Sequence, residues 1–465
     1  MEQYCFSWVG KAAAKLLAET PRTTVLSEAS KHHESPSRNI LIKGDNLEGL
    51  KHLLETFAQK IGFIYIDPPY NTGKNNFVYQ DTRELQQERS RAQMLSKTAR
   101  SHSAWLNFIY PRLILAQRLL RDNGVIFISI DDNEEAQLRL LCNELFGEEN
   151  FITRIVWHNN KKGRQQDPHI KGTNEAILAY AKDIQQLQLA MEKRACPVKN
   201  LREDDISQFE KGYPLHNGTA DFHINNRPNL AYSIYYHPDT TDCITVDEKV
   251  RKGKEWTIGK ASRLDLLEQG YLRITPKYNL KYDNQRVWRW GQDRFLRDYK
   301  TELIFVLEKD GRPYFYGKAR LPEKNTKYMR FKNYIDIDSG RGKLELKSLG
   351  IPNYFEKPKP LELLQHLLKM YPTDDEVIVL DFFAGSGSTA HAVMRQNAID
   401  HGKRSWILIQ LDEQIPEGKP AYNHGFRSIC DITQRRIELG ITQLQQDFPD
   451  AKDLEFSVFV LKQAQ

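Results

Sequence analysis

The chain has 465 residues, of which 40% are hydrophobic, and 67 Lys and Arg residues exceed 61 Asp and Glu residues to give a net charge of +6. This composition predicts a soluble globular protein of about two domains, and the small positive excess does not by itself indicate nucleic-acid binding. No apolar run approaches the roughly 18 residues of a membrane span, and five cysteines without CxxC spacing exclude a zinc ribbon or a disulfide framework. We therefore expect a cytoplasmic protein without a metal site or membrane association.

Five short apolar runs share one pattern, because each is rich in β-branched residues, nearly continuous, and closed by an aspartate. In chain order these runs are 39–45, 61–67, 124–131, 377–381 and 406–412. Continuous apolar strands are typical of a parallel sheet with helices on both faces, and amphipathic stretches follow these runs. The pattern predicts a doubly wound α/β fold, whose ligands bind beyond the carboxyl ends of the strands. For any single aspartate, termination of a strand by a polar residue is the alternative.

The second run ends in Asp67-Pro68-Pro69-Tyr70, the most specific short motif of the chain. The two prolines fix φ and remove two N–H donors, so the loop is rigid and presents carbonyl acceptors. The Asp67 carboxylate, when ionised, is also an acceptor. The motif therefore suits a ligand that donates hydrogen bonds, and a bland proline turn is the alternative.

An exocyclic amino group is a donor that fits this loop. Its two hydrogens can be accepted by the Asp67 carboxylate and the Pro68 carbonyl, while the Tyr70 ring stacks on the base. Such an amine is a poor nucleophile because its lone pair is delocalised into the ring, and holding both hydrogens turns that lone pair towards an electrophile. Alignment and electrostatics would then supply most of the rate, without a covalent intermediate.

The strand pattern stops between about 185 and 345, where basic and aromatic residues are densely mixed. The clearest mixtures are 277–295, 312–320 and 327–334. Basic residues interleaved with aromatic ones are typical of a surface that neutralises phosphates and stacks on bases. An ordinary α+β insertion with a solvated charged face is the alternative.

The fourth run leads into a glycine turn and a helix, VIVLDFFAGSGSTAHAVM, in which residues 385–390 match G-x-G-x-x-A. Glycines allow the backbone to turn tightly and to approach a ligand closely at the helix N-terminus. This turn indicates a nucleotide-like cofactor. A nicotinamide-dependent oxidoreductase carries the same fingerprint but leaves the DPPY motif unexplained, and a purely structural turn is a further alternative.

Together, the DPPY motif and the downstream FAGSG loop resemble the S-adenosylmethionine-dependent DNA amino-methyltransferases. The order of catalytic loop, central recognition region and glycine loop is similar to that of their β class. The segments GDNLEGLKHL, YIDPPYNTGKNNFVYQD, NEAILAYAKD, KPKPLELLQHLL and DFFAGSGSTAHAVM are similar to the modification subunits of type III restriction–modification systems. The resemblance covers nearly all of residues 40–183 and 350–412.

The resemblance implies roles for single residues through the positions of the motifs. The catalytic motif corresponds to Asp67, Pro68, Pro69 and Tyr70. The cofactor S-adenosyl-L-methionine is expected to bind at Asp45, Lys359, Pro360, Asp381, Phe383, Ala384, Gly385, Gly387, Gln410 and Asp412. Candidates for contact with DNA are Arg286, Arg289 and Trp290, and an internal salt-bridged strand is the alternative for each.

The chain departs from the family pattern in two ways. Related enzymes often end the WILIQ strand on an acid that binds the ribose hydroxyls, whereas this chain has Gln410, followed closely by Asp412 and Glu413. The chain also looks short for a full type III modification subunit. The length bears on a restriction partner more than on the chemistry.

The fold implied by the resemblance is a Rossmann-like methyltransferase sheet with circularly permuted motif order and an inserted α+β target-recognition domain. We expect an N-terminal extension at 1–39, a catalytic half at 40–184, the target-recognition domain at 185–345, and a cofactor-binding half with a C-terminal segment at 346–465.

The implied reaction transfers a methyl group from S-adenosyl-L-methionine to the N6 amino group of an adenine flipped out of double-stranded DNA, as part of a restriction–modification system. In this family, aspartate at the start of the motif favours adenine over the N4 position of cytosine. A non-catalytic DNA-binding specificity subunit is the remaining interpretation. The expected partners are double-stranded DNA, a second copy in a homodimer and a restriction (Res) subunit, at the nucleoid of a bacterial cytoplasm.

Overall fold

The chain folds into two compact units, one formed by residues 1–192 and 330–465 and the other by residues 193–329. The computed structural model describes residues 5–31, 37–72, 97–163, 169–195, 201–281, 283–308, 311–320, 326–372 and 376–464. The second unit is therefore an insertion between the two halves of the first. Within the described ranges, no helix is long and apolar enough to cross a membrane.

A mixed ten-stranded sheet forms the centre of the first unit, in the order β1-β23-β2-β22-β21-β3-β4-β6-β5-β20. The strands are β1 Thr24–Lys31, β2 Ile40–Lys43, β3 Ile61–Ile66, β4 Leu120–Ile130, β5 Phe151–His158, β6 Asn174–Ala181, β20 Tyr334–Asp336, β21 Ile378–Asp381, β22 Ser405–Gln410 and β23 Ser457–Gln463. All neighbours from β23 to β4 are parallel, whereas β6 is antiparallel to β4 and β5, and β1 is antiparallel to β23.

The five apolar runs of the sequence are adjacent strands of this sheet, in the order β2-β22-β21-β3-β4. Every residue of β3 and of β22 is buried, as expected for parallel strands covered on both faces. The doubly wound α/β fold predicted from these runs is therefore confirmed, as is the Rossmann-like sheet that the resemblance implied.

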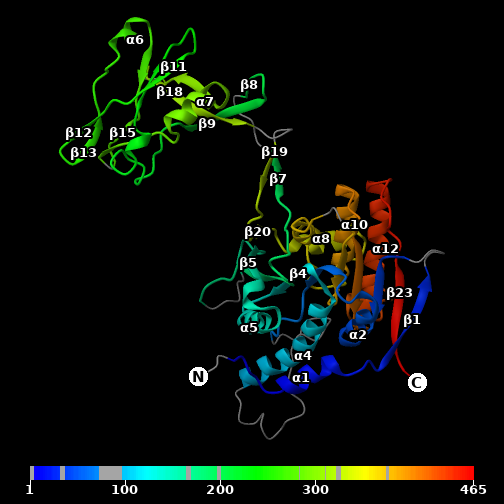
Figure 1. Cartoon of the computed structure of the whole chain (residues 1–465). Coiled ribbons are helices and arrows are strands. Elements are labelled where there is room, and N and C mark those ends of the chain that lie inside the picture. Colours follow the sequence, from blue (N-terminus) through cyan, green and yellow to red (C-terminus); the bar gives the residue numbers. More distant parts are fainter. Residues whose placement is uncertain are drawn as a thin grey trace. The chain divides into compact units, whose positions relative to one another are not determined.

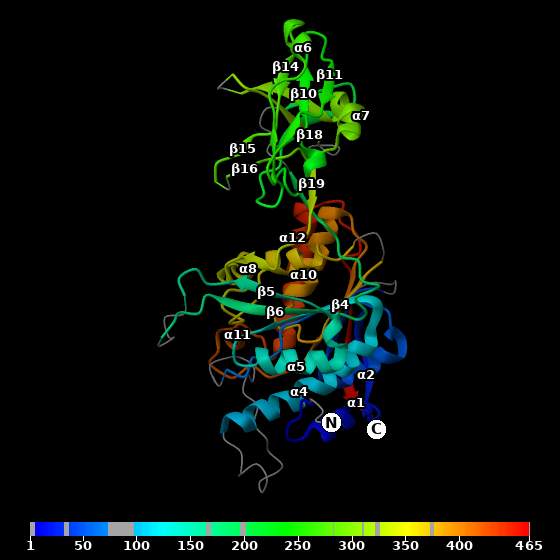
Figure 2. The same ribbon diagram turned by 60° about the vertical axis from the view of Figure 1, so that its left-hand side comes forward.

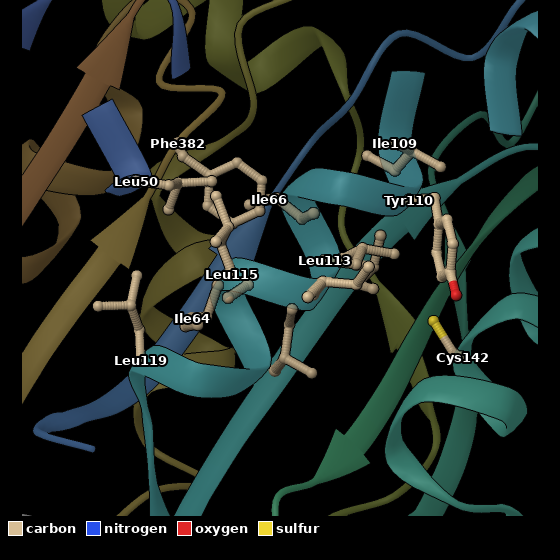
Figure 3. Packing of buried hydrophobic residues seen from close by; sticks show 14 of the residues in the cluster. Leu50, Ile64, Ile66, Ile109, Tyr110, Leu113, Leu115, Leu119, Cys142 and Phe382 are labelled. Carbon is tan, nitrogen blue, oxygen red and sulfur yellow. The ribbon is translucent and has the colours of Figure 1, made fainter. Parts of the chain in front are cut away.

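Helices cover both faces of the sheet (Figure 1). The helices of the first unit are α1 Lys11–Glu19, α2 Asn46–Phe57, α4 Lys97–Leu119, α5 Glu135–Phe146, α8 Gly340–Ser348, α9 Leu361–Leu368, α10 Ser388–Asp400, α11 Pro420–Asn423 and α12 Ile429–Asp447, with a 3-10 turn at Glu148–Asn150. Of these, α8 and α11 pack in a separate cluster with residues of α12. Successive side chains of β3 point to opposite faces of the sheet and so pack against different helical layers. Ile64 and Ile66 pack with α1, α2, α4 and α5, and Figure 3 shows them with Leu50 of α2, Ile109 of α4 and Cys142 of α5. Phe63 and Tyr65 pack with α9, α10 and α12.

The N-terminal residues belong to the body of the first unit. Helix α1 contacts α4, and its Ala14 and Ala18 are buried in the core on that face. Strand β1 pairs with β23 at one edge of the sheet. Residues 11–31 thus complete one helical layer and extend the sheet.

The second unit is an α+β body with several small antiparallel sheets, including β17-β18-β9-β8 and β11-β10-β14 (Figure 2). Its elements are β8 Arg202–Glu203, β9 Gln208–Pro214, β10 Ser233–Tyr236, β11 Cys243–Val246, β12 Lys249–Lys252, β13 Glu255–Ile258, α6 Leu264–Glu268, β14 Leu272–Ile274, β15 Tyr278–Asn279, β16 Asn284–Gln285, α7 Gln292–Glu302, β17 Leu303–Leu307 and β18 Pro313–Arg320, with a 3-10 turn at Pro228–Leu230. Strands β7 Glu192–Ala195 and β19 Thr326–Met329 pair with each other where the chain enters and leaves this unit. Its main core contains Tyr232, Trp288, Phe295 and Phe315.

The register of two central strands brings the two motif loops together. Strands β21 and β3 are parallel neighbours, with Val379 opposite Phe63 and Leu380 opposite Ile64. The DPPY loop follows β3, and the glycine turn follows β21. Both loops therefore lie at the carboxyl edge of the sheet, where doubly wound folds bind their ligands.

Candidate active site

The DPPY loop is tied to the helix layer beneath it. The Trp105 Nε1–H of α4 donates a hydrogen bond to the Pro69 carbonyl at 2.6 Å. The Tyr70 hydroxyl donates to Asp67 Oδ1 at 2.6 Å. Two contacts and two prolines thus hold the carboxylate of Asp67 at the end of β3 in one orientation.

The Lys359 ammonium lies against the DPPY motif. Its Nζ is 2.9 Å from Asp67 Oδ1, 2.8 Å from the Tyr70 hydroxyl and 3.4 Å from Glu175 Oε2. It also lies 5.0 Å from the centroid of the Trp157 ring. Lys359 was expected beside the cofactor, and the structure places it on the wall of a cavity in contact with the Asp67 carboxylate.

This charge cluster changes the protonation of its members. Burial raises the pKa of Asp67, although Lys359 and Tyr70 oppose that shift. Burial works to lower the pKa of Lys359, but the Asp67 and Glu175 carboxylates outweigh it and hold that pKa above its usual range. Lys359 is therefore a permanent cation at neutral pH, and the Asp67 carboxyl group loses its proton at a higher pH than an exposed aspartate.

A cavity of about 280 Å³ lies beside the DPPY loop and the glycine turn. Asp67 and Pro69 of the motif line it. Residues expected to bind the cofactor also line it: Asp45, Lys359, Asp381, Phe383, Ala384, Gly385 and Gln410. The structure therefore brings most of the sequence-predicted site residues to one cavity.

Three expected cofactor residues do not line this cavity. Pro360 is the residue that precedes α9, and Gly387 precedes α10 in a left-handed conformation with φ +80°. Asp412 is exposed, whereas the next residue, Glu413, lines the cavity. The acid on the cavity wall that follows Gln410 in the sequence is thus Glu413, not Asp412.

Gln410 holds the glycine turn from the neighbouring strand. Its side-chain Oε1 accepts a hydrogen bond from the Gly385 N–H at 2.7 Å. Gly385 has φ +54°, and a Cβ atom there would lie 3.2 Å from the Phe355 ring. The Gln410 side chain also donates an N–H to the Leu411 carbonyl, so its amide makes two hydrogen bonds that stabilise the turn. A carboxylate at this position could make only the first, because it has no N–H to donate.

Asp381 and Asp45 close two other sides of the cavity. Asp381 accepts hydrogen bonds from the Phe383 N–H at 2.9 Å and the Thr389 hydroxyl, and burial raises its pKa to about 7. Asp45 caps α2 by accepting from the backbone N–H groups of the first turn and lies 3.1 Å from the Arg112 guanidinium.

The candidates for DNA contact lie in the second unit. Arg286 and Arg289, together with Lys277, depress the pKa of buried His216 to about 4, after burial itself as the largest cause. Within the described ranges these three cations form no ion pair with a carboxylate. Trp290 packs on the core of this unit, with the Arg294 guanidinium 4.4 Å from its ring centroid.

Comparison with known families and proteins gives a match over most of the residues that form this site. The family N6_N4_Mtase, described as DNA methylase, matches residues 61–417. This match includes the DPPY loop, the inserted unit and the glycine turn. The chain belongs to the DNA methylase family.

The methylase is similar to three proteins of restriction–modification systems. It is 37% identical to the type III restriction-modification enzyme EcoPI Mod subunit of Escherichia phage P1, over 94% of this chain and 68% of that protein. It is 33% identical to the EcoP15I Mod subunit of Escherichia coli, over 94% of this chain and 69% of that protein. It is 31% identical to the type II methyltransferase M.KpnI of Klebsiella pneumoniae, over 90% of both chains.

The cavity of the methylase suits S-adenosyl-L-methionine by its chemistry. Four acidic side chains line it, Asp45, Asp67, Asp381 and Glu413, which complement a cationic sulfur and an ammonium group when ionised or accept hydrogen bonds from ribose hydroxyls. Aromatic side chains of Phe108, Phe355, Phe382 and Phe383 supply apolar wall for an adenine ring. The glycine turn presents backbone where a side chain would fill the space.

Sequence reasoning missed several residues of the site. Arg436 of α12 donates hydrogen bonds to the Ser386 and Ser388 hydroxyls at 2.8 and 2.6 Å, and so supports the glycine turn from behind. Arg112 and Glu175 reach the site from α4 and β6. Single charged residues far from a motif carry no local signature, and only sheet pairing and helix packing bring them here.

Proposed function

We propose that this methylase transfers a methyl group from S-adenosyl-L-methionine to the N6 amino group of adenine in double-stranded DNA. The observation that carries the proposal is the single cavity in which Asp67 of the DPPY loop and the glycine turn at Gly385 both lie. Family membership supports the same chemistry.

The residues of the chain position the amine and hold the cofactor. When bound, S-adenosyl-L-methionine supplies an electrophilic methyl group. Asp67 and the Pro68 carbonyl accept the two amine hydrogens and turn the lone pair towards the cavity, while Tyr70 stacks on the base. The Pro69 carbonyl is engaged by Trp105 and keeps the loop rigid. After transfer, one N–H bond of the methylated amine breaks and its proton passes to an acceptor at this edge, for which Asp67 is in place.

On the cofactor side, Asp45, Asp381, Phe383, Ala384, Gly385, Gln410 and Glu413 are proposed to bind the cofactor directly. Pro360 and Gly387 act by setting the start of α9 and α10. Lys359 contacts the catalytic carboxylate and the cavity alike.

Adenine is the proposed target, and cytosine N4 is the alternative within the same family. The test is to incubate the purified chain with methyl-labelled S-adenosyl-L-methionine and mixed genomic DNA, digest the DNA to nucleosides and separate them. Label in N6-methyladenine supports the proposal. Label in N4-methylcytosine would show that cytosine, not adenine, is the target. Absence of label despite measured cofactor binding would favour a non-catalytic specificity subunit.

The second unit is proposed to bind the duplex through a cationic cluster, Lys277, Arg286 and Arg289. His216 lies among these cations, and its ring is 5.7 Å from Tyr314, which also lies under the Lys277 ammonium at 3.9 Å. Tyr213, 81% exposed, lies 5.9 Å from the Arg289 guanidinium. Cations without carboxylate partners suit phosphate neutralisation, and the exposed Tyr213 ring beside Arg289 suits base stacking, whereas Tyr314 is buried. Trp290, being packed on the core, acts by supporting this segment.

Two types of restriction–modification system could contain this methylase. Similarity to the Mod subunits supports a type III modification subunit that assembles with a Res subunit, whereas similarity to M.KpnI supports a type II methyltransferase. Affinity capture of the tagged chain from its own cells decides between them, because a modification subunit recovers a second protein at fixed stoichiometry. A homodimer, tested by light scattering, and a location at the nucleoid complete the proposal.

A further inference from the structure

Glu175 lies beside the catalytic motif although no motif contains it. It is the second residue of β6, the antiparallel neighbour of β4, and so reaches the DPPY loop across the sheet. Its Oε2 lies 3.4 Å from Lys359 Nζ and accepts a hydrogen bond from the Tyr70 hydroxyl at 3.2 Å. The Glu175 side chain is only 13% exposed, so its charge is weakly screened by water.

The Lys359 cation raises a chemical difficulty for the proposed reaction. During methyl transfer to an amine, positive charge develops on the nitrogen that Asp67 holds. Lys359 Nζ, 2.9 Å from the same Asp67 carboxylate, places a positive charge next to that nitrogen. Alone, Lys359 would cancel the charge of Asp67 and disfavour the transition state.

Glu175 removes this difficulty because it shares Lys359 with Asp67. The two carboxylates and one ammonium carry one net negative charge, which favours positive charge on the amine. Lys359 in turn donates to the Tyr70 hydroxyl, which donates to Asp67. Lys359 and Tyr70 therefore hold the Asp67 carboxylate in place.

We infer that Glu175 is a positioning residue for methyl transfer, which offsets the charge of Lys359 so that Asp67 remains a net anionic acceptor. This inference rests on the proposed function. Glu175 touches neither the cavity nor the amine and acts through Lys359 and Tyr70.

Glu175→Gln tests the inference, because glutamine keeps the size and the acceptor oxygen but removes the charge. Single-turnover methylation at saturating cofactor and DNA is expected to slow by roughly 10- to 100-fold, since one unit charge is lost near the amine at an effective dielectric of about 20. Cofactor affinity, measured by calorimetry without DNA, is expected to stay within about twofold of wild type. Glu135→Gln is the matched control, because Glu135 pairs with Arg154 on neighbouring β5, away from the cavity.

Adding Lys359→Met to Glu175→Gln separates electrostatics from structure. The single Glu175→Gln variant leaves the cluster neutral, whereas the double variant restores one net negative charge. The double variant is therefore expected to methylate faster than Glu175→Gln. A double variant no faster than Glu175→Gln would overturn the inference, because restoring the net charge of the cluster would then have no effect on the rate.

The pH dependence supplies a readout that a merely structural residue would not change. The charged and titratable groups that face Asp67 are Glu175, Lys359, Tyr70, Tyr65 and Asp381. Glu175 raises the pKa of Asp67, so Glu175→Gln is expected to move the acid limb of the rate profile to lower pH while the maximal rate falls. An unmoved acid limb would overturn the inference. Wild-type protein that methylates no base would instead overturn the proposed function.

Discussion

At the scale of single residues, the site depends on buried charges whose partners are specified by geometry. Asp67 shares Lys359 with Glu175, and its other hydrogen-bond donor is the Tyr70 hydroxyl. A buried carboxylate without such partners would be protonated at neutral pH and could not accept from both an amine and a lysine. Lys359 and Tyr70 therefore oppose the rise in the pKa of Asp67 that burial causes.

Tyr70 is expected to stack on the base through its ring and to hold Asp67 through its hydroxyl, and two substitutions distinguish these roles. Tyr70→Ala removes the ring and should weaken binding of DNA with a mismatched target base by about 1–3 kcal/mol, the usual value of a base–aromatic stack. Tyr70→Phe keeps the ring and removes the hydroxyl that donates to Asp67, so affinity should persist while the methylation rate falls. Fluorescence anisotropy measures the affinities, and equal affinities for wild type and Tyr70→Ala would contradict stacking.

Asp381 predicts a pH dependence of stability. Its pKa is raised from 3.8 to about 7 by burial, so the folded protein holds a proton that the unfolded chain releases over that interval. Its contribution to the free energy of unfolding therefore declines as pH rises from about 4 to about 7 and stays level above. Asp381→Asn removes this decline, and its melting temperature should rise relative to wild type across the same interval. A constant difference in thermal scans would contradict the raised pKa.

At the scale of elements, strands β3 and β21 determine the site because each ends in a functional loop at the same edge. The glycine turn after β21 is backed by α12, whose Thr433 hydroxyl donates to the Gly385 carbonyl at 2.5 Å. A Cβ atom on Gly387 would lie 3.1 Å from the Thr433 carbonyl oxygen. The turn is thus constrained both by its left-handed conformation and by the helix behind it.

A pair of glycine substitutions tests that constraint. Gly387 and Gly418 have φ of +80° and +84°, but a Cβ atom on Gly418 meets nothing within 4 Å. Gly418→Ala should cost about 1 kcal/mol of unfolding free energy through conformation alone, and Gly387→Ala should cost more because of the added contact. Urea denaturation compares them, and equal losses would contradict a tight fit against α12.

Contiguous elements of the site could be predicted from the sequence, whereas contacts across the sheet could not. Asp67, Asp381 and Gly385 lie in motifs that follow strands, and the strand pattern alone placed them at the carboxyl edge. Glu175 and Arg436 reach the same site through packing of β6 and α12, which no local pattern encodes. In the sequence, Gln410 stands where related enzymes often have a ribose-binding acid. Only the structure shows that its side chain accepts a hydrogen bond from Gly385 and so supports the glycine turn.

At the scale of the whole molecule, the cavity with its charge cluster and the cationic cluster proposed to bind the duplex lie in separate compact units. Unit one contains the cavity and its charge cluster. Unit two carries Lys277, Arg286 and Arg289 around His216. This division predicts that changes in the second unit alter affinity for DNA without altering the methyl-transfer step.

Neutralising the cationic cluster tests that division. Lys277→Gln, Arg286→Gln and Arg289→Gln should each reduce the slope of log affinity against log salt by about 1, because each cation displaces counterions from a phosphate. Arg297→Gln is the matched control, since Arg297 is 71% exposed but paired with Asp298 at 2.8 Å. Methylation at saturating DNA should be unchanged in all four variants. A slope that none of the three alters would remove the cluster from the interface.

The most direct test of the central claim is the amount of N6-methyladenine formed by wild type and by Asp67→Ala at equal occupancy of S-adenosyl-L-methionine. The carboxylate lies at the cavity edge beside the Lys359 ammonium, and its loss should abolish methylation while cofactor binding survives. Digestion of the DNA and mass spectrometry of its nucleosides measure the product. Equal yields from the two proteins would contradict an amine held by Asp67, and with it the proposed mechanism.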